Sequence, residues 1–306
     1  MSSLQVDHVH TLYFAEFGNS QGIPLLFMHG GPGSGCNPAQ ANLLYPEGFR
    51  IIQLDQRSCG QSTPIGSLEA NTTPELVADM ERLREHLKIE RWAIYGGSWG
   101  TVLALEYAKH FPERTLGVLL RGVFLARRED WNWFALPDGV SKQFPAAYQA
   151  LLASLQIYYH TDPASVLLER LQAESESAYQ AALAWDAWEA TLMQTGAPNF
   201  NPDPSTWTTR IARNKIYAHY AANRFFLPEQ GVLQGLDKLE QIPVYAVHGR
   251  QDLVCQFTAA ELLAKYLRQY QLLAVAAGHG LYETALQQGL ASIAKNLYHY
   301  LKTEKS

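Results

Sequence analysis

The chain has 306 residues, of which 47% are hydrophobic and 17% charged, and its net charge is −5. This composition is typical of a globular protein with a sizeable core and room for an inserted subdomain, and the acidic balance without a basic run argues against nucleic-acid binding. The three cysteines are widely spaced, the N-terminus has no signal-peptide pattern, and no apolar run approaches the ~20 residues of a membrane span. Together these observations predict a cytoplasmic protein without membrane contacts.

Short apolar runs along the chain predict buried strands, with helical patterns between most of them. Near-continuous apolar strands are expected in a parallel sheet that is covered on both faces. The helical pattern at 73–87 has Thr73 as a candidate cap ahead of Pro74. This alternation predicts an α/β fold with a mostly parallel central sheet. The expected strands are IPLLFMHG (23–30), FRIIQLDQ (49–56), RWAIYGG (91–97), TLGVLLRG (115–122), IPVYAVHG (242–249) and YQLLAVAAGHG (270–280).

Residues from about 128 to about 237 interrupt the alternation of strands and helices. They are dense in tryptophan and tyrosine, and a helical pattern runs over 162–194. Because the segment is too long for one crossover between strands, we interpret it as an inserted helical cap. The predicted organisation is a first part of an α/β core over 1–127, the cap over 128–237 and a second part of the core over 238–306.

A serine between glycines follows the third expected strand, in IYGGSWGT (94–101). Gly96, Ser98 and Gly100 form the G-x-S-x-G pattern of a nucleophile elbow, a tight strand-to-helix turn that projects the serine hydroxyl out of the sheet. Side chains at the two glycines would collide with the strand and the helix. The pattern predicts Ser98 as a nucleophile, and an ordinary glycine-rich turn is the alternative.

A serine nucleophile needs a base, and the base needs an acid that orients it. In α/β-hydrolases the three residues follow in the order Ser, then Asp or Glu, then His. Asp252 follows the strand expected at 242–249, and His279 follows the next strand between two glycines. Because active-site groups of open α/β sheets lie at the carboxyl ends of strands, we predict a triad of Ser98, Asp252 and His279 in an α/β-hydrolase fold.

The tetrahedral intermediate of such a reaction needs hydrogen-bond donors for its oxyanion. The glycine-rich loop FMHGGPGSG (27–35) follows the first expected strand, and its glycines leave backbone N–H groups uncovered by side chains. Together with the amide after the nucleophile, this loop supplies two N–H groups, which we assign to Gly31 and Trp99. No metal or cofactor is expected. The histidines of HVH (8–10) alternate in an expected strand, where surface positions are more common than metal sites.

Several motifs together resemble the proline iminopeptidases (prolyl aminopeptidases), which are serine peptidases with the α/β-hydrolase fold. The resemblance runs from about residue 11 to about 298 and includes the cap. It implies release of an N-terminal residue, above all proline, from small peptides, and it implies no cofactor. The motifs are HGGPGSG, DQRSCGQS, GGSWGT, LRGVFLARRED, WDAWE, GRQDLVC and AGHG.

The resemblance also implies which residues bind the substrate. The family holds the free amino terminus with carboxylates of the cap and the pyrrolidine ring among aromatic side chains. By motif match, Glu189 is one carboxylate, Phe124 is one ring-pocket aromatic, and Phe134 stands where tyrosine is usual. In IYAHYA (216–221), Tyr217 stands where the second carboxylate is expected and Ala221 where another aromatic is expected.

These two departures bear on specificity rather than on catalysis. Loss of one carboxylate weakens attraction for an ammonium, and loss of a ring enlarges the proline pocket. An esterase or amidase with the same triad and no need for a free amino terminus is therefore the alternative function. A non-catalytic receptor with the same fold is a further alternative, against which the complete triad argues. Strictness for proline, peptide length and oligomeric state stay open.

Overall fold

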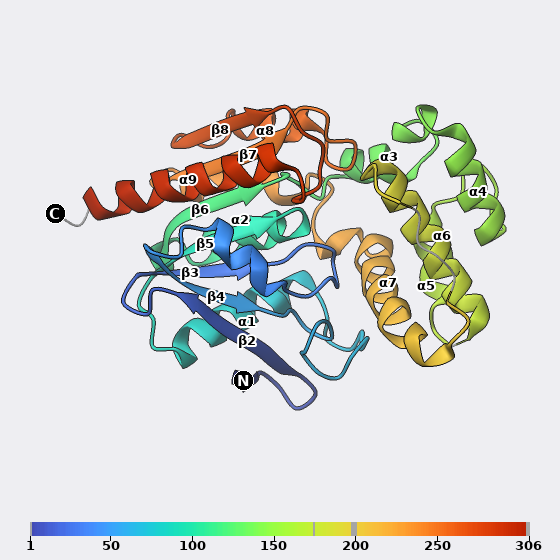
Figure 1. Cartoon of the computed structure of the whole chain (residues 1–306), viewed down its shortest axis with the longest axis horizontal. Helices are drawn as coiled ribbons and strands as arrows, with labels where there is room; N and C mark the ends of the chain where they lie inside the picture. The colour runs from blue at the N-terminus through green and yellow to red at the C-terminus, as the bar shows by residue number, and fades with distance from the viewer. Residues whose placement is uncertain (1, 174, 197–200, 304–306) are drawn as a thin grey trace.

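The structure is a computed structural model that describes residues 2–173, 175–196 and 201–303. Within these residues one eight-stranded sheet forms the centre of the molecule, in the order β1-β2-β4-β3-β5-β6-β7-β8 (Figure 1). The pairs from β4 to β8 are parallel, whereas β1 and β2 add an antiparallel edge. The strands are β1 Ser2–Gln5, β2 Thr11–Gly18, β3 Ile23–Met28, β4 Phe49–Leu54, β5 Trp92–Gly97, β6 Thr115–Arg121, β7 Val244–Gly249 and β8 Tyr270–Val275.

Helices cover both faces of the sheet, as the continuous apolar strands predict. Leu26 and Met28 of β3 join the core cluster on the face of α1, α2 and α8, whereas Leu25 and Phe27 join the cluster on the face of α9. The helices are α1 Thr73–His86, α2 Trp99–His110, α3 Arg128–Ala135, α4 Pro145–Leu155, α5 Pro163–Arg170, α6 Glu176–Leu192, α7 Trp207–Ala222, α8 Phe257–Leu263 and α9 Thr284–Thr303.

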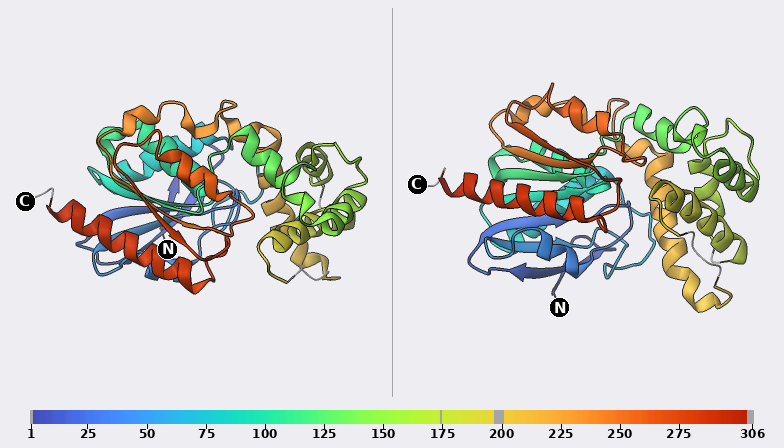
Figure 2. Two further views of the ribbon diagram at one scale, coloured as in Figure 1. Left: turned by 90° about the horizontal axis from the view of Figure 1, so that it is seen from above. Right: turned by 45° about the horizontal axis from the view of Figure 1, so that its top comes forward.

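Helices α3 to α7 lie between β6 and β7 in the chain and form a separate layer beside the sheet (Figures 1 and 2). Figure 1 shows the arrows of the parallel strands β3 to β7 pointing towards this layer, so that the carboxyl ends of these strands face it. Within the layer α6 contacts α4, α5 and α7. Short 3-10 helices complete the fold: η1 Pro38–Leu43, η2 Pro112–Arg114, η3 Val140–Lys142, η4 Pro204–Thr206, η5 Arg224–Phe226, η6 Gly231–Leu233 and η7 Leu236–Leu239.

The amino-terminal edge of the sheet differs from the sequence expectation. Strands β1 and β2 precede the first expected strand, and HVH (8–10) lies in the connection between them rather than in a strand. His10 is fully buried, and its Nδ1 lies 3.2 Å from an oxygen of Asp7. A surface position for this histidine was therefore wrong, because the turn folds its ring inward against the carboxylate.

Two helix boundaries also differ from the expectation. Thr73 does not cap α1: the N-cap residue is Thr72, and the Thr73 hydroxyl instead donates a 2.6 Å hydrogen bond to the carbonyl of Phe225. The helical pattern over 162–194 is divided into α5 and α6, with residue 174 outside the described residues. Ser175 begins the second helix because its hydroxyl accepts the amide hydrogen of Ala178, as an N-cap does.

None of the described helices combines the length and the apolar character that crossing a membrane requires.

Candidate active site

Ser98 lies at the turn between β5 and α2, in a strained backbone conformation. Its φ of 54° falls in the left-handed region, which non-glycine residues rarely adopt. A Cβ at Gly96 would lie 2.1 Å from the carbonyl oxygen of Gly100, and a Cβ at Gly100 would lie 2.3 Å from that of Met28. Both glycines are therefore required by close backbone approaches, and the turn has the geometry that the G-x-S-x-G pattern predicts.

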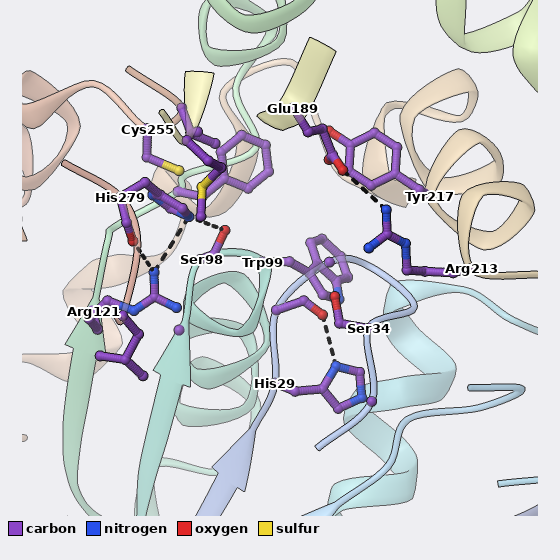
Figure 3. Close-up of a pocket in the computed structure, with 18 of the residues that line it drawn as sticks. His29, Ser34, Ser98, Trp99, Arg121, Glu189, Arg213, Tyr217, Cys255 and His279 are labelled. Carbon is purple, nitrogen blue, oxygen red and sulfur yellow. Dashed lines mark hydrogen bonds and ion pairs between the residues drawn. The ribbon is translucent and has the colours of Figure 1, made fainter. Parts of the chain in front are cut away.

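The structure brings together Ser98, His279 and Asp252, which lie far apart in the sequence. The Nε2 of His279 is 3.1 Å from the Oγ of Ser98, and its Nδ1 is 2.7 Å from the Oδ2 of Asp252. Figure 3 shows the imidazole beside the Ser98 hydroxyl at the wall of the pocket. This hydrogen-bonded chain can move a proton from the serine to the imidazole while the carboxylate holds the other ring nitrogen.

Asp252 is buried and stays ionised. Burial alone would raise the pKa of its carboxyl, but attraction to His279 and hydrogen bonds from His248 and His279 outweigh burial and hold the pKa well below its usual range. Its Oδ1 accepts the amide hydrogens of Val254 and Cys255 at 2.9 and 2.8 Å. The carboxylate therefore has a fixed orientation, with Oδ2 directed at the imidazole.

The two predicted oxyanion donors, Gly31 and Trp99, line the same pocket as Ser98. Trp99 is the first residue of α2, and an amide in the first turn of a helix has no acceptor within that helix. Its indole N–H donates to the side chain of Gln56 at 3.0 Å, which fixes the residue. Gly31 has φ of 113° and lines the same pocket as Ser98 and Trp99. The role of both amides as donors stays a prediction.

Aromatic side chains form one wall of this pocket, which has a volume of about 480 Å³. Phe134 and Tyr217 line it, with ring centroids 6.5 Å apart, and both contact Trp185. Burial raises the pKa of Tyr217 well above its usual value, so the phenol is neutral. Phe124 also lines the pocket and meets Phe225 edge-on at 5.1 Å. The three aromatic residues predicted from the motifs therefore share one cavity.

The pocket differs from the motif-based expectation at two residues, Phe225 and Ala221. Phe225 lies in η5, has φ of 54°, and no motif indicated it. Ala221, at the position where another pocket aromatic is usual, is buried in the core cluster and is not among the described residues that line the pocket. Thr101 holds the backbone of Phe124 in place, because its Oγ1 accepts the amide hydrogen of Phe124 at 3.0 Å.

Glu189 of α6 lines the pocket within a group of charged side chains. Its carboxylate lies 3.4 Å from the guanidinium of Arg213 of α7, which also forms an ion pair with Asp186. Asp186 also forms a second ion pair, with Arg210 at 3.3 Å, and accepts a 2.9 Å hydrogen bond from Asn214. Burial, together with a smaller effect of the Asp186 charge, raises the pKa of Glu189 to about 7 against the opposing effect of Arg213.

Sequence reasoning missed three polar residues of the site. His248 accepts the amide hydrogen of Val123 at Nδ1, and its Nε2 lies 3.3 Å from the Oδ2 of Asp252. Arg121, at the end of β6, donates to the carbonyl of His279 at 3.1 Å. Arg213 precedes Tyr217 by four residues on α7, so helical spacing was the one signal that could have placed it beside the pocket.

Among the described residues, no group of three or more His, Cys, Asp or Glu side chains is arranged to hold a metal ion.

Comparisons with known proteins agree with this architecture. The model of the alpha/beta hydrolase fold family matches residues 23–286. Among solved structures, a proline iminopeptidase of Mycobacterium smegmatis superposes with a TM-score of 0.66 and 21% identity, covering 99% of this chain and all of that one. A haloalkane dehalogenase loop variant from Bradyrhizobium elkanii superposes with a TM-score of 0.68 and 18% identity, covering 100% and 99%. At these identities the two structures show the fold.

Curated relatives are more similar in sequence. The proline iminopeptidase of Xanthomonas citri is 40% identical over 285 residues, which cover 92% of this chain and 91% of that protein. That of Neisseria gonorrhoeae is 35% identical over 300 residues, covering 96% and 94%. That of Arabidopsis thaliana is 37% identical over 302 residues, covering 94% and 77%. With this identity over nearly its whole length, the chain belongs to the proline iminopeptidase family of α/β-hydrolases.

Proposed function

We propose that the protein is a serine aminopeptidase that releases an N-terminal residue, preferentially proline, from small peptides. The observation that carries the proposal is the hydrogen-bonded chain of Ser98, His279 and Asp252, with Ser98 at a strained turn. Ser98 and His279 line an aromatic pocket that Glu189 also lines. The full-length similarity to proline iminopeptidases supports the substrate class.

The proposed reaction proceeds through an acyl-enzyme. Ser98 Oγ attacks the scissile carbonyl while His279 Nε2 takes its proton, and Asp252 holds the Nδ1–H of the ring. The amides of Gly31 and Trp99 bind the oxyanion of the tetrahedral intermediate. The C–N bond then breaks, and His279 returns the proton to the leaving amine. Water hydrolyses the acyl-serine by the same steps.

The layer of α3 to α7 supplies three of the four proposed substrate contacts and acts as a cap over 128–237, whereas the fourth, Phe124, follows β6. Glu189 accepts hydrogen bonds from the substrate ammonium, and Phe124, Phe134 and Tyr217 enclose the ring of an N-terminal proline. The shared cavity of these four side chains supports this assignment. Tyr217 brings a neutral phenol to the position where a second carboxylate is usual in the family.

A profile of arylamide substrates tests the function. We expect prolyl arylamide to exceed other aminoacyl arylamides in kcat/KM by about tenfold or more, because differences in apolar contact of a ring are worth about 1–3 kcal/mol. Simple acyl esters serve as the comparison, since their turnover needs the triad alone. Turnover of esters without turnover of any aminoacyl arylamide would support the esterase alternative and contradict the proposal.

Glu189→Gln is expected to lower kcat/KM for free-amino substrates by about tenfold, which corresponds to about 1.4 kcal/mol. We expect a loss at the lower end of the free energies typical of charge contacts, because the Glu189 side chain is 28% exposed and its carboxylate already lies beside Arg213. Simple acyl esters should be affected less than about twofold. Equal loss on both substrate classes would show that Glu189 supports the cap structure instead of the ligand.

The ionisation of Glu189 predicts a pH dependence. Its pKa is raised to about 7, so the carboxylate gains a proton as the pH falls through this value and then no longer attracts an ammonium. KM for free-amino substrates should therefore rise below about pH 7 in the wild type, and this rise should be absent from Glu189→Gln. An unchanged KM profile in the variant would assign the titration to another group.

A further inference from the structure

The carboxylate that would bind the substrate ammonium already has a cationic neighbour from the protein itself. Arg213 extends from α7 towards Glu189, with Nη2 3.4 Å from its carboxylate, and both side chains line the pocket (Figure 3). The Arg213 side chain is 40% exposed, whereas Glu189 is less so, at 28%. A substrate ammonium and the guanidinium would therefore compete for the same carboxylate.

The charges around Glu189 nearly cancel. Two carboxylates of α6, Asp186 and Glu189, face two guanidinium groups of α7, Arg210 and Arg213. An ammonium is attracted by the net charge near it rather than by a single neutralised partner. The neutral phenol of Tyr217 adds no negative charge. This pocket therefore attracts a cation less than its carboxylates alone would suggest.

Arg213 has a second carboxylate partner, so it can release Glu189 and still form an ion pair. It also pairs with Asp186, which lies three residues before Glu189 on the same helix and so on the same face. When a substrate takes Glu189, Arg213 retains the ion pair with Asp186. The guanidinium thus has two acceptors within reach, and only one of them is in the proposed ammonium site.

We propose that Arg213 is a specificity-determining residue that competes with the substrate ammonium for Glu189. This inference rests on the proposed ammonium-binding role of Glu189. In consequence the pocket selects its acyl group more by ring shape than by charge. It accepts five-membered cyclic acyl groups with or without a ring nitrogen, and proline loses much of the advantage that its charge would otherwise give it.

A pair of inhibitors that differ in charge tests the inference. L-Prolinol carries the cyclic ammonium, and cyclopentylmethanol has the same ring without it. Both are measured as competitive inhibitors of p-nitrophenyl acetate hydrolysis, which needs only the triad. In Arg213→Met the inhibition constant of prolinol should fall about five- to tenfold, the size of one partly exposed charge contact, while that of cyclopentylmethanol changes less than about twofold.

The matched control is Arg210→Met. It removes a guanidinium that contacts the same Asp186 and lies one turn earlier on α7, while the contact of Arg213 with Glu189 remains. We expect the inhibition constant of prolinol to change less than in Arg213→Met, by about twofold at most, because Arg210 contributes to the net charge but pairs with Asp186 rather than with the carboxylate that the ammonium needs. Arg213→Lys keeps a cation beside Glu189 and should resemble the wild type more than Arg213→Met does.

Folding of the main variant is supported by the remaining partners of Asp186, which are Arg210 and Asn214. Arg213→Gln is a second variant that retains a hydrogen-bonding head group and should give the same direction of change. Weaker prolinol binding in these variants would overturn the inference, because Arg213 would then orient Glu189 for the ligand. An equal change for both inhibitors would also overturn it, since Arg213 would then act on pocket shape.

The ratio of the inhibition constants of cyclopentylmethanol and prolinol also separates this inference from the proposed function. If the wild type hydrolyses the ester but no prolyl arylamide, the proposed function fails, while the comparison of prolinol with cyclopentylmethanol still reports on Arg213. If prolyl arylamide is a substrate and the ratio does not respond to Arg213→Met, the function stands and the inference fails.

Discussion

Ser98→Ala is expected to lower kcat by about 10⁵- to 10⁶-fold on both arylamides and esters, the loss typical of a removed serine nucleophile. The reason is that the Ser98 hydroxyl is the group held 3.1 Å from the base nitrogen of His279 at a turn built to expose it. Steady-state kinetics measure the loss, and near-ultraviolet circular dichroism reports that the fold is retained. Activity within about tenfold of the wild type would contradict the acyl-enzyme mechanism.

Ser34 provides a matched control for this change. It is a second serine that lines the same pocket, within the glycine-rich loop of residues 27–35. Ser34→Ala should keep kcat within about tenfold of the wild type, because its hydroxyl has no part in the proton transfer. A fluorophosphonate should label the wild type and Ser34→Ala but not Ser98→Ala. Absence of label on the wild type would favour the non-catalytic receptor.

The elements nearest the catalytic chemistry could be predicted because local patterns determine them. Continuous apolar runs gave β3 to β8, and the glycines around Ser98 indicated a turn with no room for side chains. Asp252 and His279 could be predicted from chain order, since the carboxyl ends of parallel strands meet at one edge of a sheet. Strand β2 was missed because its residues alternate between buried and partly exposed, so no continuous run marks it.

The contacts of the substrate pocket could be predicted only in part. Motif matching gave Glu189 and Tyr217 as positions, but it could not indicate which side chain of α7 faces Glu189. The answer depends on how α6 packs against α7, and Arg213 reaches across that contact. His248 was missed for a similar reason: it lies within β7 and meets Asp252 only because the chain turns back after the strand.

Asp252→Asn is expected to lower kcat by about 10⁴-fold, as loss of the orienting carboxylate does in serine proteases. Oδ1 accepts the amides of Val254 and Cys255, so the oxygen of an asparagine will stay there and its NH₂ will face His279. The NH₂ donates to Nδ1 and leaves the proton on Nε2, where the ring cannot accept the Ser98 proton. Kinetics on prolyl arylamide measure the loss, and ¹⁵N chemical shifts of the imidazole report the tautomer. The exposed Asp237→Asn is the control. A loss under about tenfold with an unchanged tautomer would contradict the proposed role of Asp252.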